Sequence, residues 1–518
     1  MSSEGASADN SLARNMGPLG AVATVVAGTL GAGLFVTLGT ASSTTGPSVI
    51  LVVALSGLLA MAIATNYSWM ATIFPGAAGS YTYISRTFDS RLPGFVVTWS
   101  KWLGYMAADA VLAIGFGSYL KVFYPNVVLP FGVDFTVGAG FALLTVLFLV
   151  NLVGTKGYSV SQNLIFGFLI VSILVLVVPG LFSIDTVNYQ PFFTGGLDGF
   201  VAAAVPLFYA YIGIAVAAQM GAEVKNPGRN LPLAMVGGTA ILIVLYMLTA
   251  AVIYGVVGDY TVLANSDRPL ATAAEVFLGD IGTGIVAFGG LLATASSVHA
   301  VMAAGIKMPY SWSWDEVFPK QFSAVSERFR TPHWSLLTLY LVAAGLTFWS
   351  GGLDRALAIA TFSYLIAYLT VSLTAGYVYV KRPDIGSRAA FQPGTWFYLS
   401  IGVATVGAAA LLTQAANWLG VFAVDYGAVF DALSRGALLE AAGVVNETIP
   451  TLSIYVPWLL VGLGIFGVYW YLGNQRGTDV GAILDTLPGV PSDEWNPDIR
   501  ENDPEASDDR TPSPGAGD

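Results

Sequence analysis

Long apolar stretches separated by short polar loops follow one another through most of the chain. Twelve of these stretches, here called spans 1 to 12, lie near 17–43, 47–73, 93–120, 135–155, 158–184, 199–221, 231–257, 281–306, 334–350, 356–380, 396–420 and 453–473. Each approaches the roughly 20 residues that a helix needs to cross about 30 Å of hydrocarbon. The pattern predicts an all-α integral membrane protein with about twelve transmembrane helices. The stretch 420–452 could add a short amphipathic helix at the surface.

Lysine and arginine are unevenly shared between the alternate loops. If the N-terminus is inside, seventeen fall on the inner side and four, Lys121, Arg268, Arg355 and Arg435, on the outer side. Cytoplasmic loops of membrane proteins retain such an excess. The polar first fifteen residues lack the build of a cleavable signal peptide. We therefore expect a multi-pass plasma-membrane protein with both termini in the cytoplasm, and Asn446, which begins a glycosylation-type triplet, in an outer loop.

Composition narrows the class of protein further. The chain of 518 residues is 55% hydrophobic and 10% charged, and it has no cysteine and only two histidines. Disulfides, thiol nucleophiles and cysteine-ligated metals are therefore excluded. Clustered histidines and paired acids are also missing from the spans, so we expect neither an enzyme nor a bound cofactor. The expected surroundings are the lipid bilayer and a small-molecule substrate, with no nucleic-acid partner.

The acidity of the chain is concentrated at its C-terminal end. The net charge is −11, and residues 474–518 hold eleven acids against three arginines, which gives 3 − 11 = −8. This segment is rich in Pro, Asp, Glu, Ser and Gly and has few apolar residues to bury. It is predicted to be a disordered cytoplasmic tail.

Two spans carry residues that interrupt a helix. Span 1 contains Gly28, Gly31 and Gly33, and span 6 contains Pro206 and Gly213. Broken helices are tolerated in a membrane only where protein surrounds the freed backbone groups. Because spans 1 and 6 each open a block of five, they suggest an inverted five-plus-five repeat with two additional helices. The implied division is 1–15 as a cytoplasmic segment, 16–184 and 199–380 as the repeats, 395–473 as the additional helices with an outer loop, and 474–518 as the tail.

Breaks of this kind expose backbone groups that suit a zwitterion. A half-helix that begins near Gly31 to Gly33 would direct its N–H groups and the positive end of its dipole at a carboxylate. The carbonyl groups freed in span 6 would accept hydrogen bonds from an ammonium group. Close packing of helices on small residues is the alternative explanation for the glycines.

The residues around the breaks resemble the amino acid/polyamine/organocation superfamily of permeases across spans 1 to 10. The similar segments are Gly31, Ala32, Gly33 and Phe35 in span 1, the loop Phe74 to Phe88, Phe208 to Gly213 in span 6, Glu223 to Pro227 after it, and the loop Asp315 to Pro332. Ala78 replaces a glycine that is usual in the second segment.

The resemblance implies a fold of ten core helices plus two, and a secondary active transporter of amino acids that works by alternating access. By matching position it implies a substrate site made of Gly31, Ala32, Gly33, Phe208, Tyr209, Ala210, Ile212 and Gly213. Tyr209 would close over the substrate, unless it is an ordinary packing tyrosine. Many members carry an acid where this chain has Ala215.

Asp109 and His299 are ionisable residues inside spans 3 and 8. Such residues are costly in a membrane and are functional candidates. The position that Asp109 matches contacts the substrate's side chain in the arginine/agmatine antiporter branch, so its carboxylate would favour cationic amino acids or amines, and a structural aspartate is the alternative. His299 fits packing better than a proton-carrying or substrate-binding role. Lys101 is expected to snorkel from the inner end of span 3.

The coupling ion is a separate question. Some proton-coupled relatives pair a glutamate with a lysine at positions that here hold Gly104 and Leu169, which argues against that mechanism. Sodium-coupled relatives offer hydroxyl ligands at the positions of Ser296 and Ser297, and carbonyl groups near Ala27, Leu30 and Ala293 could complete an oxygen shell. Sodium coupling is therefore expected, with proton coupling, exchange, serines that satisfy their own backbone, or a non-transporting nutrient sensor as alternatives.

Overall fold

The computed structural model describes residues 16–153, 158–326, 331–349, 353–419, 426–435, 437 and 452–490, and Asn446 lies outside them. The described chain is helical, with only two isolated β-bridges, Met16 to Val224 and Ala77 to Met220. Ten described helices are long and apolar enough to cross a membrane, and Pro18–Gly31 and His333–Trp349 are shorter apolar helices. Together they overlap all twelve predicted spans, so the predicted multi-pass helical architecture is confirmed. The inverted repeat stays a prediction.

The spans are built from the following helices. They are α1 (Pro18–Gly33) and α2 (Thr37–Thr45) for span 1, α3 (Val49–Ile73), α5 (Arg91–Leu120), α6 (Phe135–Val153), α7 (Tyr158–Leu181), α8 (Gly196–Tyr209) and α9 (Val216–Gln219) for span 6, α10 (Pro227–Pro232) and α11 (Gly238–Val256) for span 7, α14 (Gly279–Gly305), α16 (His333–Trp349), α17 (Leu353–Lys381), α19 (Trp396–Trp418) and α22 (Leu452–Arg476). Shorter helices lie between them: α4 (Ser80–Thr87), α12 (Tyr260–Ala264), α13 (Pro269–Phe277), α15 (Lys307–Trp314), α18 (Pro383–Gly386), α20 (Tyr426–Ser434) and α23 (Val480–Leu484).

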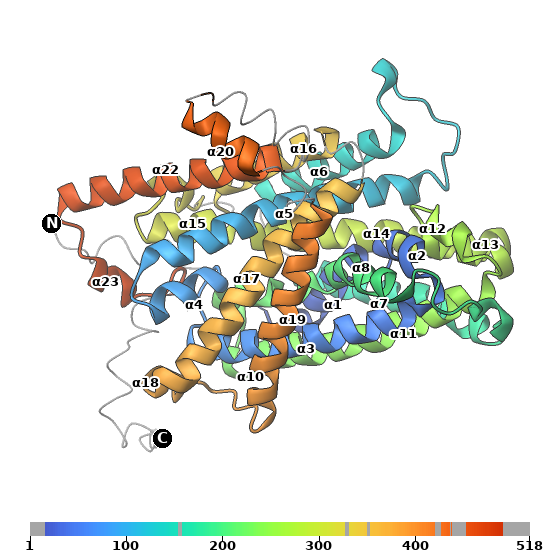
Figure 1. The fold of residues 1–518 in the computed structure, drawn as a ribbon, viewed down its shortest axis with the longest axis horizontal. Helices are drawn as coiled ribbons and strands as arrows, with labels where there is room; N and C mark the ends of the chain where they lie inside the picture. Colours follow the sequence, from blue (N-terminus) through green and yellow to red (C-terminus); the bar gives the residue numbers. More distant parts are fainter. Residues whose placement is uncertain are drawn as a thin grey trace, which may run out of the picture.

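Helix α5 is the central element of the bundle. In its most apolar stretch 89% of the residues are buried, against 28% in α19 and 17% in α22. It packs against α14, α17, α6 and α16, whereas α19 and α22 lie at the periphery (Figure 1). Helix α22 is fixed to α5 by two tryptophans that each donate to the other's carbonyl, Trp99 Nε1 to Trp458 O at 2.7 Å and Trp458 Nε1 to Trp99 O at 3.0 Å.

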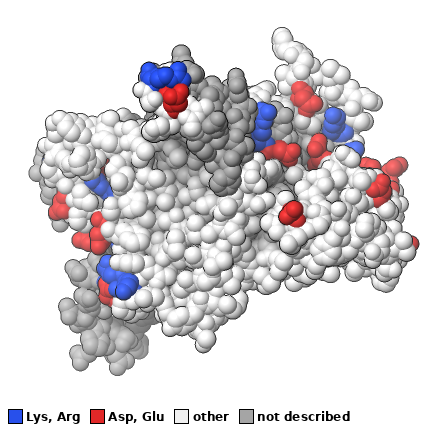
Figure 2. Space-filling view, viewed as in Figure 1, with Lys and Arg blue, Asp and Glu red and all other residues white. Residues whose placement is uncertain are grey.

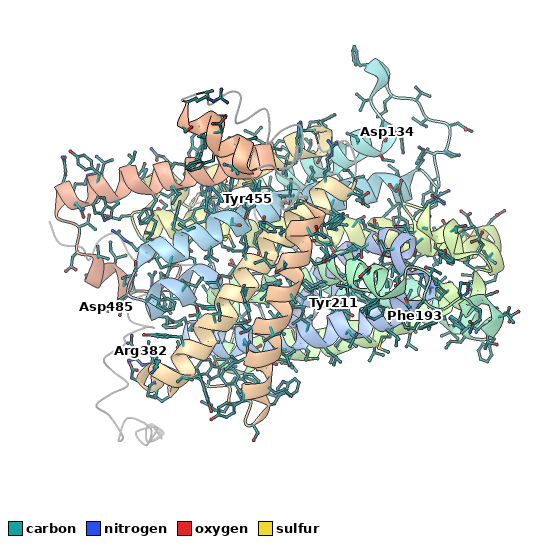
Figure 3. The ribbon with its side chains drawn as sticks, viewed as in Figure 1. Asp134, Phe193, Tyr211, Arg382, Tyr455 and Asp485 are labelled. Carbon is teal, nitrogen blue, oxygen red and sulfur yellow. The ribbon has the colours of Figure 1, made fainter. Side chains whose placement is uncertain are left out.

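The bundle has two polar ends and an apolar middle. In Figure 3, Arg382 and Asp485 lie at one end, Asp134 lies toward the other, and Tyr211 lies between them. We call the first the α4 end, because α4, α15, α18 and α23 lie there, and the second the α12 end, where α12 and α13 lie (Figure 1). In Figure 2 the visible charges lie mostly near the two ends and along the upper edge, and much of the middle is uncharged. That distribution suits hydrocarbon.

Both predicted interruptions are present, and one lies later than expected. In span 1 the helix continues through Gly33, a turn covers residues 34–36, and α2 starts at Thr37. The expectation that a half-helix begins at Gly31 to Gly33 is therefore wrong by about one turn. In span 6, α8 ends at Tyr209, a 3₁₀ turn covers Ile212–Ala215, and α9 follows.

The loops that resemble those of the permease superfamily meet at the α4 end. Glu223 forms an ion pair with Lys307 at the start of α15. Asn226 has a φ of 46°, a left-handed conformation that asparagine tolerates better than most residues, and Pro227 then opens α10. In the loop before α4, Ala78 has a φ of 62°. A glycine would adopt that conformation without strain, which is the physical reason that glycine is usual there.

A buried ion pair ties these loops together. Arg86 on α4 and Asp315 after α15 form a two-pronged contact that includes a 2.8 Å bond from Nη2 to Oδ1. Tyr81 donates to Asp315 Oδ2 at 2.7 Å. Burial alone lowers the pKa of the Arg86 guanidinium, but Asp315 and Tyr81 more than offset it, and the pKa lies above its ordinary value. Arg86 is therefore a fixed positive charge.

The same arginine binds the C-terminal segment. Its Nε and Nη2 donate to Thr486 O at 3.1 and 3.0 Å, and Ala77 N donates to Pro488 O at 2.8 Å. Residues 474–476 complete α22, and residues 479–490 comprise α23 and a segment packed on α4 and α15. The expected tail boundary at 474 is thus too early, because this first part of the segment finds buried partners. Residues 491–518 lie outside the described part.

We expect Arg86→Ala to destabilise the protein by about 3–5 kcal/mol, because it leaves the Asp315 carboxylate buried without its counter-charge. The measurement is thermal or denaturant unfolding of the purified protein in detergent. Arg382→Ala is the matched control, since Arg382 is 33% exposed where it pairs with Asp384. An exposed pair contributes only about 0–1 kcal/mol. Equal losses of stability in the two variants would contradict this account.

Candidate substrate site

The two interrupted spans touch each other through their glycines. A Cβ atom on Gly33 would lie 2.5 Å from Ala210 Cα, and one on Gly213 would lie 2.3 Å from Thr29 Oγ1. No side chain fits at either position, so the backbones of spans 1 and 6 are in direct contact where both are interrupted. Of the predicted site residues, Gly33, Ala210 and Gly213 are therefore brought together. The side chain of Ala32 is not described.

Tyrosines from three helices hold the carbonyl groups at this contact. The hydroxyl group of Tyr246 on α11 lies 3.0 Å from both Thr29 O and Ala210 O, which share its single proton. Tyr119 on α5 donates to Phe35 O at 2.8 Å, and Tyr368 on α17 donates to Ile212 O. The carbonyl groups expected to receive an ammonium group thus already have one partner each, although a carbonyl oxygen can accept a second hydrogen bond. The sequence alone did not single out these three tyrosines.

The aromatic residues of span 6 are buried next to the contact. Tyr209 donates to Ala108 O on α5 at 3.4 Å, which places it beside Asp109. Phe208 meets Tyr368 edge-on with ring centroids 6.0 Å apart. Tyr209 therefore lies between span 6 and α5.

Asp109 is the most unusual member of the site. Its side chain has no solvent exposure, and neither carboxylate oxygen accepts a hydrogen bond from any described residue. The tyrosines Tyr105, Tyr209 and Tyr364 are close enough to interact with it electrostatically. Buried carboxyl groups are normally paired. The arrangement leaves acceptor capacity for a ligand that can donate hydrogen bonds.

The proposed sodium ligands lie on a second contact, between α1 and α14. A Cβ atom on Gly31 would lie 2.2 Å from Ala293 O and 2.6 Å from Ser297 Oγ. Ser297 Oγ donates to Ala27 O at 3.2 Å, and Leu30 O accepts from Leu34 N within the helix at 3.2 Å. The structure thus brings Ala27, Ala293 and Ser297 together around Gly31. Ser296 is buried in the same helix, and His299 is half-buried one turn further.

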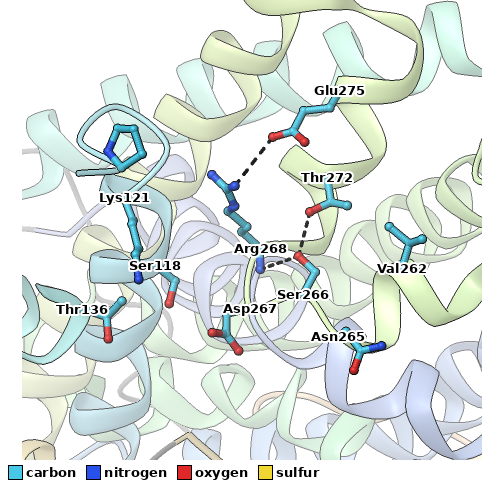
Figure 4. Close-up of a pocket in the computed structure, with 11 residues that line it drawn as sticks. Ser118, Lys121, Thr136, Val262, Asn265, Ser266, Asp267, Arg268, Thr272 and Glu275 are labelled. Atoms are coloured by element: carbon cyan, nitrogen blue, oxygen red, sulfur yellow. Dashed lines mark hydrogen bonds and ion pairs between the residues drawn. The ribbon is translucent and has the colours of Figure 1, made fainter. Parts of the chain in front are cut away.

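A cavity of about 500 Å³ opens at the α12 end. Figure 4 shows its charged and polar side chains, with Arg268 and Glu275 paired at 3.9 Å and Lys121 across the cavity. Its lining consists of Ser118, Lys121, Pro125, Thr136, Val262, Asn265, Ser266, Asp267, Arg268, Thr272 and Glu275. Ser118 is nine residues beyond Asp109 on α5, or about 13 Å along the helix. The cavity therefore lies on the α12 side of Asp109 and is not the contact itself.

Lys101 does not snorkel. It has no solvent exposure, and its ammonium group donates to Ser80 Oγ at 2.9 Å inside the bundle. The expectation failed because a lysine ten residues into α5 is about 15 Å from the helix end, farther than its side chain reaches. The tyrosines near Lys101 in sequence and those in span 10 were the signal that could have indicated its buried position.

Most of the chain is similar in sequence to known proteins. Residues 16–423 match the family model described as amino acid permease. A methylthioribose transporter of Bacillus subtilis is 26% identical over 400 residues, covering 74% of this chain and 85% of the relative. A branched-chain amino acid permease of the same organism is 23% identical over 404 residues, covering 75% and 85%. The vacuolar cationic amino acid transporter 4 of Arabidopsis thaliana is 29% identical over 393 residues, covering 71% and 64%.

Gly31→Ala is expected to abolish uptake and reduce the yield of folded protein, because the added methyl group would overlap the backbone oxygen of Ala293 at 2.2 Å. Gly345→Ala in α16 is the control, since its Cβ meets nothing within 4 Å and alanine favours a helix by about 1 kcal/mol over glycine. Folded yield by size-exclusion chromatography and amino acid uptake in vesicles measure both effects. Normal uptake by Gly31→Ala would show that α1 and α14 are not in contact as described.

Proposed function

Because the chain belongs to the amino acid permease family, we propose that it is a secondary active transporter that carries amino acids by alternating access and prefers those with a cationic side chain. The family assignment makes the protein a membrane transporter and not an enzyme. The preference for a cation is the finer part of the proposal. It rests on one observation, the buried carboxyl group of Asp109 that no described residue hydrogen-bonds.

The relatives' names support an amino acid substrate without fixing which one. They include a permease for branched-chain amino acids, transporters for cationic amino acids, a serine/threonine exchanger and a transporter for methylthioribose. These relatives are 23–29% identical to this chain and differ in substrate. The choice among them therefore depends on the side chains of this site.

The site offers a different group to each part of a cationic amino acid. The N-terminus of α2 after the first break would hold the carboxylate, because its free N–H groups and helix dipole favour an anion. The second lone pairs of the carbonyl oxygens at Ala210 and Ile212 would accept the α-ammonium group. Asp109 would then accept a hydrogen bond from the side-chain cation. Tyr209, beside Asp109, would separate the bound substrate from one side of the membrane.

We assign the α4 end to the cytoplasm. Arg86, Lys225, Lys307 and Arg382 lie at that end, and the lysine and arginine excess of cytoplasmic loops supports this orientation. The cavity at the α12 end would then face outward and give access to the site from outside the cell. We place the protein in the plasma membrane.

We propose sodium as the coupling ion, with the α1 and α14 contact as its site. Oxygen atoms of Ala27, Ala293 and Ser297 are the ligand type that a hard cation needs, and two of these residues already share a hydrogen bond of 3.2 Å. Sodium would replace that hydrogen bond and hold α1 against α14. Sodium binding would thereby favour the arrangement of span 1 that also carries the substrate contacts.

Asp109→Asn is expected to reduce lysine uptake about tenfold or more while it changes leucine uptake little. A hydrogen bond to a charged group contributes about 1.5–3 kcal/mol, and 1.4 kcal/mol is a factor of ten. The measurement is competitive uptake of labelled lysine and leucine in proteoliposomes. Asp134→Asn is the control, because Asp134 is an exposed acid of the loop after α5. Equal losses for both substrates would remove the proposed selectivity but would leave amino acid transport itself intact.

Replacing external sodium with choline is expected to reduce uptake severalfold, and Ser297→Ala is expected to raise the sodium concentration needed for half-maximal uptake. Thr294→Val is the control, since the Thr294 hydroxyl donates within its own helix to Gly290 O at 2.8 Å. Uptake rates measured over a range of sodium concentrations test both statements. Uptake that does not depend on sodium would exclude the ion site without affecting the proposal for Asp109.

A further inference from the structure

Lys101 is enclosed by a cage of tyrosine rings. The rings of Tyr67, Tyr105, Tyr364 and Tyr368 have their centroids 5.4–5.8 Å from its Nζ atom. Besides Ser80 Oγ, its ammonium group has the side-chain oxygen of Gln219 as an acceptor at 3.1 Å, in the amide orientation that also lets Gln219 donate to Ala78 O at 2.9 Å. We call Lys101, these four tyrosines, Ser80 and Gln219 the Lys101 cluster.

No carboxylate balances this ammonium group among the described residues. Lys101 takes part in none of the ion pairs found there. The nearest acid on its own helix is Asp109, eight residues or about 12 Å away. A buried cation without a counter-ion is costly. The tyrosine rings offset part of this cost, because a desolvated cation over an aromatic face gains about 2 kcal/mol.

The cluster joins parts of the chain that are far apart in sequence. Its members come from α3, α4, α5 and α17 and from Gln219 at the end of α9. Tyr368 also donates to Ile212 O. Ile212 begins the 3₁₀ turn in the interruption of span 6, and Gln219 ends α9, the helix that follows it. The interruption and the end of α9 are thus both held by residues that surround one ammonium group.

The loop before α4 packs against the same part of span 6. Ala77 pairs with Met220 in an isolated bridge, and a Cβ atom on Gly79 would lie 2.9 Å from Ala218 O. This loop and α9 are therefore packed backbone to backbone beside the Lys101 cluster. A route from the site to the α4 end that passes along α9 is closed in this structure.

We propose that Lys101 is a positioning residue that latches the α4 side of the transport path shut. The inference rests on the alternating access proposed above. In the latched state the ammonium group draws Gln219 and Ser80 together inside the tyrosine cage, and Tyr368 holds Ile212. Opening requires the α9 half of span 6 to leave the cluster, so that Lys101 loses Gln219 and the route becomes accessible to water. A neutral side chain of the same length fills the cage but cannot donate to both oxygens.

The absence of cysteine from the chain gives a direct test. Ala218→Cys places one thiol on α9 at a position that is 1% exposed here. Its reaction rate with a membrane-impermeant maleimide added at the α4 side measures how often the route is open. Adding Lys101→Met is expected to raise this rate by about tenfold, which corresponds to 1.4 kcal/mol. Lys320→Met, at a side chain that is 74% exposed, is the control and should leave the rate unchanged.

Rescue of a smaller variant separates the latch from simple loss of packing. In Lys101→Ala, methylammonium can enter the space left by the lysine side chain and is expected to slow the labelling of Ala218→Cys again. Methanol, a neutral molecule with the same number of non-hydrogen atoms, should not slow it. Equal slowing by both molecules would show that volume and not charge closes the route, and would overturn the proposal.

Two further outcomes would also contradict the latch. One is an unchanged labelling rate in Lys101→Met with an unfolding temperature equal to that of the parent. The other is a rise in labelling that follows a general loss of thermal stability. Failure of the proposed function looks different: labelling of the Ala218→Cys parent would then respond to neither lysine nor leucine. If substrate changes the labelling rate of the Ala218→Cys parent and Lys101→Met leaves that rate unchanged, the latch is rejected while the proposed function stands.

Discussion

The structure depends on one constraint, that every backbone polar group inside hydrocarbon must find a partner within the protein. Spans 1 and 6 violate the simplest solution, an unbroken helix, at residues 34–36 and 210–215. Tyrosine hydroxyl groups from α5, α11 and α17 provide partners at or beside both interruptions. A tyrosine can do this because its ring packs as an apolar residue while its hydroxyl group donates one hydrogen bond. The breaks are therefore properties of the whole bundle and not of two helices alone.

Helix α5 provides three of the residues that lie against the interrupted spans. Tyr119 supports span 1, Asp109 lies beside Tyr209 of span 6, and Lys101 holds the far end of span 6. These three residues follow one another along a single, almost fully buried helix. A movement of span 6 relative to α5 would change the surroundings of Asp109 and Lys101 at once. In the transport cycle proposed above, that arrangement would link substrate binding to closure of the path through direct contacts.

The α4 end is reinforced by the C-terminal segment. Arg86 contacts both Asp315 and the carbonyl oxygen of Thr486, and Trp314 donates to Thr486 Oγ1 at 3.4 Å. The segment after α22 thus covers the loops that adjoin the Lys101 cluster. It joins α22, the least buried of the long helices, to the loops at the α4 end.

The sequence by itself determined the helical membrane architecture. The length of each apolar stretch and the placement of lysine and arginine depend on whether a residue meets lipid or water. It also located both interruptions within about one turn, because glycine and proline act on the local backbone. Asp109 was recognisable as a carboxyl group within an apolar span. The tertiary structure decided which residues satisfy the freed carbonyl groups, because Tyr119, Tyr246 and Tyr368 are distant in sequence from the atoms they bind. It also decided that Lys101 lies in a tyrosine cage, since only Tyr105 lies on its own helix and the other members of the cluster come from four other helices.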